Sequence, residues 1–266
     1  MAKAMLIDVT KCTACRACQV ACKQWNQLPA EKTTCQGTYE NPPELSPKTW
    51  TKLKFKEISE NGEVKWLFRK MQCMHCTDAT CVKVCPTGAA HETELGAVVI
   101  DQDKCTGCKY CVQNCPFEIP QYDTDTNTVK KCRMCYDRVS NGLTPACAQT
   151  CPPGAIQFGE REEMVSLGLE RVSALKADGN LDARLYGETE LGGLGVMYVL
   201  AEKAKTYDLP EEPKVPISAV LWQDILKPLG PILGGAAVAA FALSFLLNIG
   251  YKPEEEVRRG VRSSET

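Results

Sequence analysis

The sequence predicts an α+β fold in which two nested units form a soluble cysteine-rich domain, residues 1–219. One transmembrane helix with its flanks, residues 220–251, and a polar tail, residues 252–266, are expected to follow. Three observations lead to this prediction. Sixteen of the 17 cysteines fall into four groups of four, short apolar stretches precede two of these groups, and a long uncharged run lies near the C-terminus.

The cysteine groups have the spacing of iron–sulfur ligands. The first and third follow C-x2-C-x2-C-x3-C, the bacterial-ferredoxin spacing that gives three thiolates to one [4Fe–4S] cluster and the fourth to another. The usual proline follows the last cysteine of three groups, whereas Lys23 follows the first. Four [4Fe–4S] clusters are therefore expected. The groups are Cys12, Cys15, Cys18 and Cys22; Cys73, Cys76, Cys81 and Cys85; Cys105, Cys108, Cys111 and Cys115; and Cys132, Cys135, Cys147 and Cys151.

Two other uses of cysteine compete with this interpretation. A zinc-stapled scaffold would pair C-x2-C knuckles, which the second and fourth groups could supply. The C-x2-C-x2-C runs of the first and third groups argue against it. Disulfides are typical of short secreted frameworks, and this chain is long enough for an ordinary core. The spacing favours clusters.

The pairing of the groups follows from the gap between Cys85 and Cys105, which suits one compact two-cluster unit over residues of about 70–120. The outer groups, from about 1–40 and 127–160, would then pair across this unit by elimination. Sequential pairing, first with second and third with fourth, remains open from spacing alone. The nested ligand sets are Cys12, Cys15, Cys18 and Cys151 (first site); Cys22, Cys132, Cys135 and Cys147 (second site); Cys73, Cys76, Cys81 and Cys115 (third site); and Cys85, Cys105, Cys108 and Cys111 (fourth site).

Local patterns predict the remaining elements. Residues 5–10 (MLIDVT) and 96–103 (GAVVIDQD) are predicted strands that lead into cysteine groups. The alternating stretch over 50–70 contains Asn61–Gly62, a strong hairpin signal. An amphipathic helix is expected over about 160–177, with a stop at Gly179. Its apolar face would be Met164, Val165, Leu169, Val172 and Leu175.

Charge and composition exclude some functions. The formal net charge of −2 gives no reason to expect a nucleic-acid partner. No Ser/His/Asp set, carboxylate pair or phosphate loop is apparent, so we expect no catalytic residue. Cys35 is expected to be a small packed side chain. Positive side chains beside the cysteines would offset the negative charge of thiolate-bound clusters: Lys11, Arg16, Lys23, Lys83, Lys104, Lys109, Lys131 and Arg133.

The C-terminal run between Lys227 and Lys252 has 24 residues without a charge. At about 1.5 Å per residue, a helix of this length spans a hydrocarbon core of about 30 Å. Trp222 and Tyr251 flank it as interfacial anchors would. The alternative, a buried helix of a soluble protein, seldom runs this long uncharged. The sequence therefore predicts a single-pass protein of the cytoplasmic (inner) membrane.

Positive charges around this helix predict its orientation. Four follow the run, whereas only Lys214 and Lys227 closely precede it, which places the tail in the cytoplasm and the cysteine-rich domain outside. The first residues are too short for an export signal of their own, so a partner would have to supply one. The four charges that follow are Lys252, Arg258, Arg259 and Arg262.

With these features in place, the chain resembles the iron–sulfur (beta) subunit of membrane-bound respiratory formate dehydrogenase. The wider group is the four-cluster ferredoxin-like subunits of molybdopterin oxidoreductases. The four cysteine segments match the wider group, and residues 37–50 (GTYENPPELSPKTW), 195–201 (GVMYVLA) and 221–229 (LWQDILKPL) are similar to the formate branch. Nitrate reductase subunits have a tryptophan where this chain has Cys108, so the resemblance implies four [4Fe–4S] clusters.

The resemblance also implies partners and a direction. The first site would face a catalytic subunit that oxidises formate at a molybdenum or tungsten bis-pterin centre. The fourth site would lie nearest a membrane b-type cytochrome subunit, which passes electrons to quinone. The family supports the nested pairing and a periplasmic domain exported with a twin-arginine partner. The same relay in a hydrogenase or a polysulfide/nitrate-type reductase complex is the alternative.

Overall fold

The computed structural model describes residues 2–60, 62–222 and 227–249. The chain divides into two compact units, Met1–Ala219 and Val220–Thr266. All 17 cysteines belong to the first unit. The predicted polar tail lies outside the described residues, and so do Tyr251 and the four positive charges used to predict orientation.

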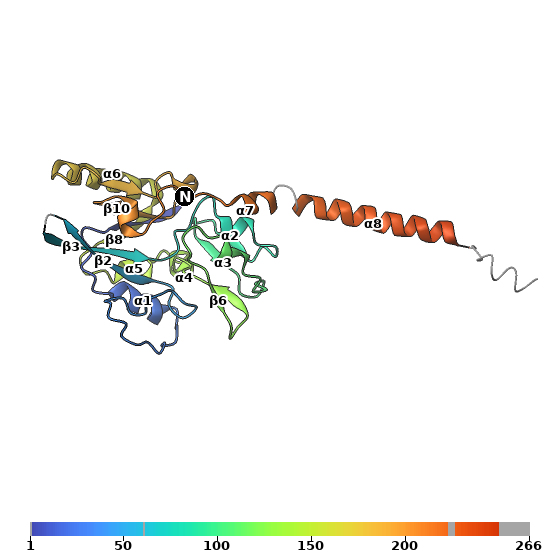
Figure 1. Cartoon of the computed structure of the whole chain (residues 1–266), viewed down its shortest axis with the longest axis horizontal. Coiled ribbons are helices and arrows are strands. Elements are labelled where there is room, and N and C mark those ends of the chain that lie inside the picture. Colours follow the sequence, from blue (N-terminus) through green and yellow to red (C-terminus); the bar gives the residue numbers. More distant parts are fainter. Residues whose placement is uncertain (1, 61, 223–226, 250–266) are drawn as a thin grey trace, which may run out of the picture. The chain divides into compact units, whose positions relative to one another are not determined.

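A four-stranded sheet joins distant parts of the first unit (Figure 1). β1 (Lys3–Asp8) runs antiparallel to β8 (Ile156–Glu160) and parallel to β10 (Val196–Leu200), which pairs with β9 (Arg184–Tyr186). Ile7 lies opposite Ile156. Because β1 leads into the first cysteine group and β8 follows the fourth, this register brings the two groups together.

Helix α6 (Arg161–Ala177) covers one face of this sheet and confirms the helix predicted over 160–177. Met164 and Val172 are buried in a cluster that includes Met197 of β10. Gly179 follows the helix with a φ of +95°, a conformation that glycine adopts without strain. Leu169 is 42% exposed, because five residues turn a helix by about 140° from Met164.

The predicted hairpin consists of β2 (Lys52–Glu60) and β3 (Glu63–Met71), paired antiparallel. Its turn contains Gly62, whose φ is +84°, while Asn61 lies outside the described residues. β3 ends two residues before Cys73, so the hairpin leads directly into the second cysteine group. Its outer end is exposed, and its inner end is buried.

Short helices and two-stranded hairpins carry the cysteine groups. Each group contains or immediately precedes at least one such helix, and the two hairpins flank the third group. The helices are α1 (Ala17–Trp25), α2 (Thr80–Lys83), α3 (Tyr110–Gln113), α4 (Tyr136–Val139) and α5 (Ala146–Gln149). The hairpins are β4 (Ala90–Glu92) with β5 (Val98–Ile100), and β6 (Gln121–Asp123) with β7 (Thr128–Lys130).

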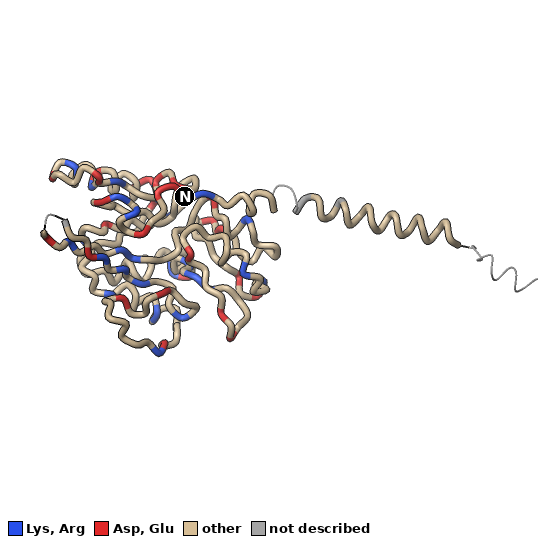
Figure 2. The backbone as a smooth tube through the Cα atoms, in the orientation of Figure 1, with Lys and Arg blue, Asp and Glu red and all other residues tan. Residues whose placement is uncertain are grey.

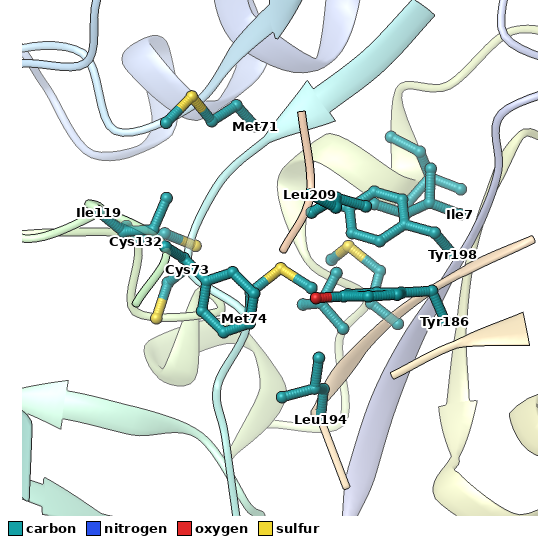
Figure 3. Packing of buried hydrophobic residues seen from close by; sticks show 14 of the residues in the cluster. Ile7, Met71, Cys73, Met74, Ile119, Cys132, Tyr186, Leu194, Tyr198 and Leu209 are labelled. Atoms are coloured by element: carbon teal, nitrogen blue, oxygen red, sulfur yellow. The ribbon is translucent and has the colours of Figure 1, made fainter. Parts of the chain in front are cut away.

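The main hydrophobic core includes cysteines as well as aliphatic and aromatic side chains. Cys73 and Cys132 lie beside one another next to Ile119, and Tyr186 and Tyr198 pack in the same cluster (Figure 3). Both tyrosines are fully buried. Several candidate ligand residues are therefore part of the core and are shielded from water.

The C-terminal segments are helical. The turns η1 (Glu190–Gly192) and η2 (Ala204–Tyr207) flank β10, and α7 (Ile217–Leu221) spans the boundary between the two units. α8 (Lys227–Asn248) contains the one candidate membrane span among the described residues, Leu229–Asn248, with a mean hydropathy of 1.9. No acidic or basic residue interrupts this span (Figure 2).

Candidate functional site

The four cysteine groups share one backbone feature, a left-handed residue directly before the second cysteine. It is Ala14, His75, Gly107 and Met134 in the four groups, with φ values of +55°, +49°, +67° and +56°. Such values are uncommon for residues other than glycine. A left-handed residue turns successive N–H groups toward one point, which creates the anion-binding nests found at iron–sulfur sites. The repeated conformation indicates four equivalent binding loops.

Three of the four predicted ligand sets each line one cavity. The cavity at the third site has an empty volume of about 370 Å³. Those at the second and fourth sites have about 350 Å³ and 310 Å³, open solvent at their mouths included. All four cysteines of the set line the cavity in each case. They are Cys73, Cys76, Cys81 and Cys115; Cys22, Cys132, Cys135 and Cys147; and Cys85, Cys105, Cys108 and Cys111.

The first site lies where α1 approaches the end of the fourth group. Burial raises the pKa of Cys12, and the charges of Cys151 and Cys15 raise it further, which makes them close neighbours. Burial raises the pKa of Cys18 to about 12, and Cys12 and Cys151 are among the groups that contribute. Cys15 is exposed. The structure thus brings the first group together with Cys151, as the nested arrangement requires.

The sites also follow one another in an order. Cys147 of the second site acts on the pKa of Cys18 of the first. Cys73 of the third site acts on the pKa of Cys132 of the second. At the other end, Cys111 of the fourth site acts on the pKa of Cys81 of the third. Cysteines of successive sites are therefore close enough to interact electrostatically, in the order first, second, third and fourth site.

Hydrogen bonds hold several of the sulfur atoms in place. The backbone N–H groups of Ala90, Met134 and Val129 donate to the Sγ atoms of Cys85, Cys132 and Cys105, each at 3.4 Å. N–H donors toward thiolate sulfur are one of the means by which proteins tune iron–sulfur centres.

The loop of the second group is fixed by the entry to β10, which sequence reasoning missed. The N–H of Gly195 donates to the carbonyl of His75 at 2.8 Å, and the N–H of Thr77 donates to the carbonyl of Gly193 at 3.0 Å. His75 is buried, and burial holds its pKa well below the usual range. Its Nδ1 accepts a hydrogen bond from Val98 at 2.9 Å. The imidazole is therefore a neutral structural group.

The cysteine-lined cavities also contain polar atoms that have no protein partner. The Nζ of Lys70 at the second site and the Oγ1 of Thr80 at the third are buried without a hydrogen bond. Both are donors, and an anionic cluster with sulfide ligands would satisfy them. The residues present therefore fit [4Fe–4S] clusters.

A single metal ion would need a different arrangement. Over residues 2–60, 62–222 and 227–249, no three His, Cys, Asp or Glu side chains converge closely enough to hold one ion. A tetrahedral zinc site made of four cysteines has all four sulfur atoms about 2.3 Å from one centre. Each thiolate of a [4Fe–4S] cluster binds a different iron, so the ligands of a cluster stand farther apart.

The positive charges predicted beside the cysteines differ in their surroundings. Lys83 pairs with Asp78 at 2.5 Å, and Lys104 pairs with Asp101 at 3.3 Å. Lys131, in contrast, is buried. Sequence reasoning missed Lys70, because it lies in β3 and belongs to none of the cysteine groups. Cys35 is exposed, so the prediction of a packed side chain was wrong.

Comparison with known proteins identifies the same modules. Two families, each described as a 4Fe-4S dicluster domain, match residues 11–89 and 64–161. A Haemophilus influenzae protein named formate dehydrogenase iron-sulfur subunit is 45% identical, over 96% of this chain and 83% of the relative. The nitrate-inducible formate dehydrogenase iron-sulfur subunit of Escherichia coli K12 is 45% identical, over 96% and 87%. The hydrogenase-2 operon protein HybA of Escherichia coli O157:H7 is 32% identical, over 86% and 81%.

Proposed function

The chain belongs to the family of formate dehydrogenase iron–sulfur subunits, and from this premise we propose that it relays electrons from a formate-oxidising catalytic subunit through four [4Fe–4S] clusters to a membrane cytochrome and quinone. Family membership makes it an electron-transfer subunit with 4Fe–4S domains. The observation that carries the finer proposal is the coincidence of ligand sets and cavities at three sites.

The residues of this chain would act by holding and insulating the relay. When bound, each cluster accepts and passes on one electron. The four nested ligand sets would supply thiolates from loops that each contain a left-handed residue. The backbone of these loops would therefore need little rearrangement to bind a cluster. Most of the ligands are buried or half-buried, so water is largely excluded and less reorganisation accompanies each transfer. The chain would carry no substrate chemistry of its own.

The order of the sites supports a linear relay with two ends. A line from the first to the fourth site has two ends, and each end has one exposed cysteine, Cys15 and Cys108. An exposed ligand at each end offers a route for electrons to enter and leave. We place the molybdenum or tungsten bis-pterin subunit at the first site and the b-type cytochrome subunit at the fourth.

The C-terminal helix would anchor the chain in the cytoplasmic membrane. Leu229–Asn248 has the length and apolar composition of a single span. The cysteine-rich domain would lie in the periplasm and the tail in the cytoplasm. Protease added to intact spheroplasts should digest the domain and spare the tail. Digestion of the tail with protection of the domain would reverse the orientation.

One experiment tests the donor. The native complex, purified without oxygen, should show formate-dependent reduction of its clusters by low-temperature EPR and formate-dependent reduction of quinone. The similarity to HybA favours a second candidate, the same relay in a hydrogenase complex. Reduction by hydrogen but not by formate would select that candidate. A colourless, zinc-loaded protein would exclude both.

A further inference from the structure

Lys70 is a buried lysine whose ammonium group has no partner in the protein. It lies near the end of β3, opposite Leu53, and is 2% exposed. Its Nζ makes no hydrogen bond to any described residue. Burying an unpaired ammonium costs several kcal/mol unless an opposite charge compensates it. A negatively charged partner other than the described protein atoms is therefore expected beside Lys70.

The backbone fixes where this side chain goes. The hydroxyl of Tyr198, a fully buried residue of β10, donates to the carbonyl of Lys70 at 2.6 Å. The hairpin is therefore pinned to the main sheet at this residue. The side chain lines the cavity of the second site, together with the four cysteines of that site. The position is set by the fold and not by a flexible surface chain.

The surroundings of Lys70 are cysteines from two sites. Burial lowers the pKa of Lys70, but the charges of Cys147, Cys18 and Cys132 outweigh burial and raise the pKa above its ordinary value. Cys147 and Cys132 belong to the second site, and Cys18 belongs to the first. Lys70 in turn lowers the pKa of Cys12. The ammonium group therefore lies within electrostatic reach of both sites.

Other buried lysines serve as a contrast. Lys131 donates to the carbonyls of Val98 and Cys132 and to the Sγ of Cys73, so its three N–H groups have partners. Lys52 donates to Glu40 and to the carbonyl of Pro43. Lys70 alone of these three lacks a partner. It is the one that faces a cysteine-lined cavity with its full donor capacity.

We propose that the ammonium group of Lys70 assists electron transfer by raising the reduction potentials of the clusters at both the first and the second site. The inference rests on the proposed function. A fixed positive charge stabilises the reduced, more negative form of a nearby centre. Because one ammonium lies within electrostatic reach of both sites, it favours the reduced form of both clusters and so makes both available for single-electron exchange. The cysteines with the largest effect on the pKa of Lys70 all belong to the first and second sites.

The test is redox potentiometry with EPR on the native complex carrying Lys70→Met, which removes the charge and keeps the length of the side chain. We expect the equilibrium constant for reduction to fall about tenfold at the second site, equivalent to about 59 mV for a one-electron couple. A smaller fall is expected at the first site and none at the fourth. Lys70→Arg should keep the wild-type potentials. Lys54→Met removes a half-buried charge from the same hairpin, paired with Asp208, and should change nothing.

The outcomes separate this inference from the proposed function. Absence of four [4Fe–4S] clusters from the wild-type complex would contradict the proposed function. Unchanged potentials in fully loaded Lys70→Met, or an equal fall at all four sites, would overturn the role of Lys70 alone. Should Lys70→Met lose iron, Lys70→Gln is the second neutral variant. Iron loss in both neutral variants with full loading of Lys70→Arg supports the need for the charge, and iron loss in Lys70→Arg as well contradicts it.

Discussion

The Nζ of Lys131 donates a hydrogen bond to the Sγ of Cys73 over 3.5 Å, and the same ammonium donates to the carbonyl of Cys132 at 3.1 Å. One buried cation thereby connects a cysteine of the third site with the backbone of a cysteine of the second. Lys131 and Cys73 are 58 positions apart in the chain. The second cysteine group, which belongs to the inner pair, and the fourth, which belongs to the outer pair, are thus joined through their ligand loops.

The nested ligand sets predict paired damage from single substitutions. Cys22→Ala should disturb the cluster at the second site and spare the one at the first, because Cys22 lies beside Cys132, Cys147 and Cys135. Cys151→Ala should have the opposite effect. Low-temperature EPR of the two variants identifies the signal that is lost. Loss of a third-site signal in Cys22→Ala would mean that the pairing is sequential.

Gly107 tests the loop of the fourth site. Its φ is +67°, and an added Cβ would meet the carbonyl oxygen of Asn127 at 2.3 Å. Gly88, close to Cys85 of the same site, has a φ of +68° and nothing within 4 Å. Left-handed strain of about 1–2 kcal/mol is therefore common to both alanine variants. Overpacking should lower the free energy of unfolding of Gly107→Ala by a further ~1–3 kcal/mol.

The readouts for these glycine variants are iron content and thermal unfolding of the complex. Gly107→Ala should lower the occupancy of the fourth cluster, whereas Gly88→Ala should keep all clusters and unfold only slightly earlier. Equal behaviour of the two variants would show that the close approach to Asn127 has no bearing on the site.

Cluster insertion should depend on pH. Burial raises the pKa values of Cys18, Cys111 and Cys132 to about 12, from about 8.5 in an unfolded chain. A raised pKa stabilises the metal-free fold at pH values below about 8.5, and this stabilisation is lost as pH rises toward 12. Since clusters bind thiolates, insertion releases these protons. A rise from pH 7 to pH 9 should therefore favour insertion.

This pH dependence can be measured by anaerobic reconstitution of chelator-treated protein, with bound iron and sulfide as the readout. Cys35→Ser is the matched control, because Cys35 is exposed and belongs to no ligand set. It should follow the wild-type curve. Iron uptake that falls between pH 7 and pH 9 would contradict the argument.

Deletion of Val220–Thr266 should separate the relay from its outlet. The cut preserves the compact unit Met1–Ala219, in which Ala219 is fully buried, and removes no cysteine. The truncated chain should assemble its clusters and reduce an artificial dye with formate when bound to the catalytic subunit. It should no longer reduce quinone. Deletion of 252–266 alone is the control and should leave quinone reduction intact.

Two results would contradict this expectation for the truncated chain. Loss of dye reduction with all clusters present would mean that the C-terminal segment also organises the catalytic side. Retained quinone reduction would mean that electrons leave by another route.

The elements that could be predicted from sequence are those with local patterns. The hairpin and α6 follow from alternation, a turn signal and helical spacing, and all four ligand loops follow from cysteine spacing. The order of the main sheet could not be predicted, because β1 pairs with strands more than 140 residues away. Ala14, His75 and Met134 are left-handed, but because none of them is glycine, this conformation could not be recognised from the sequence. Lys70 is buried where β3 meets β10, whose Tyr198 donates to the carbonyl of Lys70.

We propose that this chain holds four [4Fe–4S] clusters that formate reduces. Mössbauer spectroscopy of the iron-57-enriched native complex, before and after formate, tests it most directly, with the chain's share resolved by comparison with the isolated catalytic subunit. We expect about 16 irons in this chain, all as [4Fe–4S] and reduced by formate in single-electron steps. Fewer clusters, a three-iron centre, or clusters that stay oxidised in formate would contradict it.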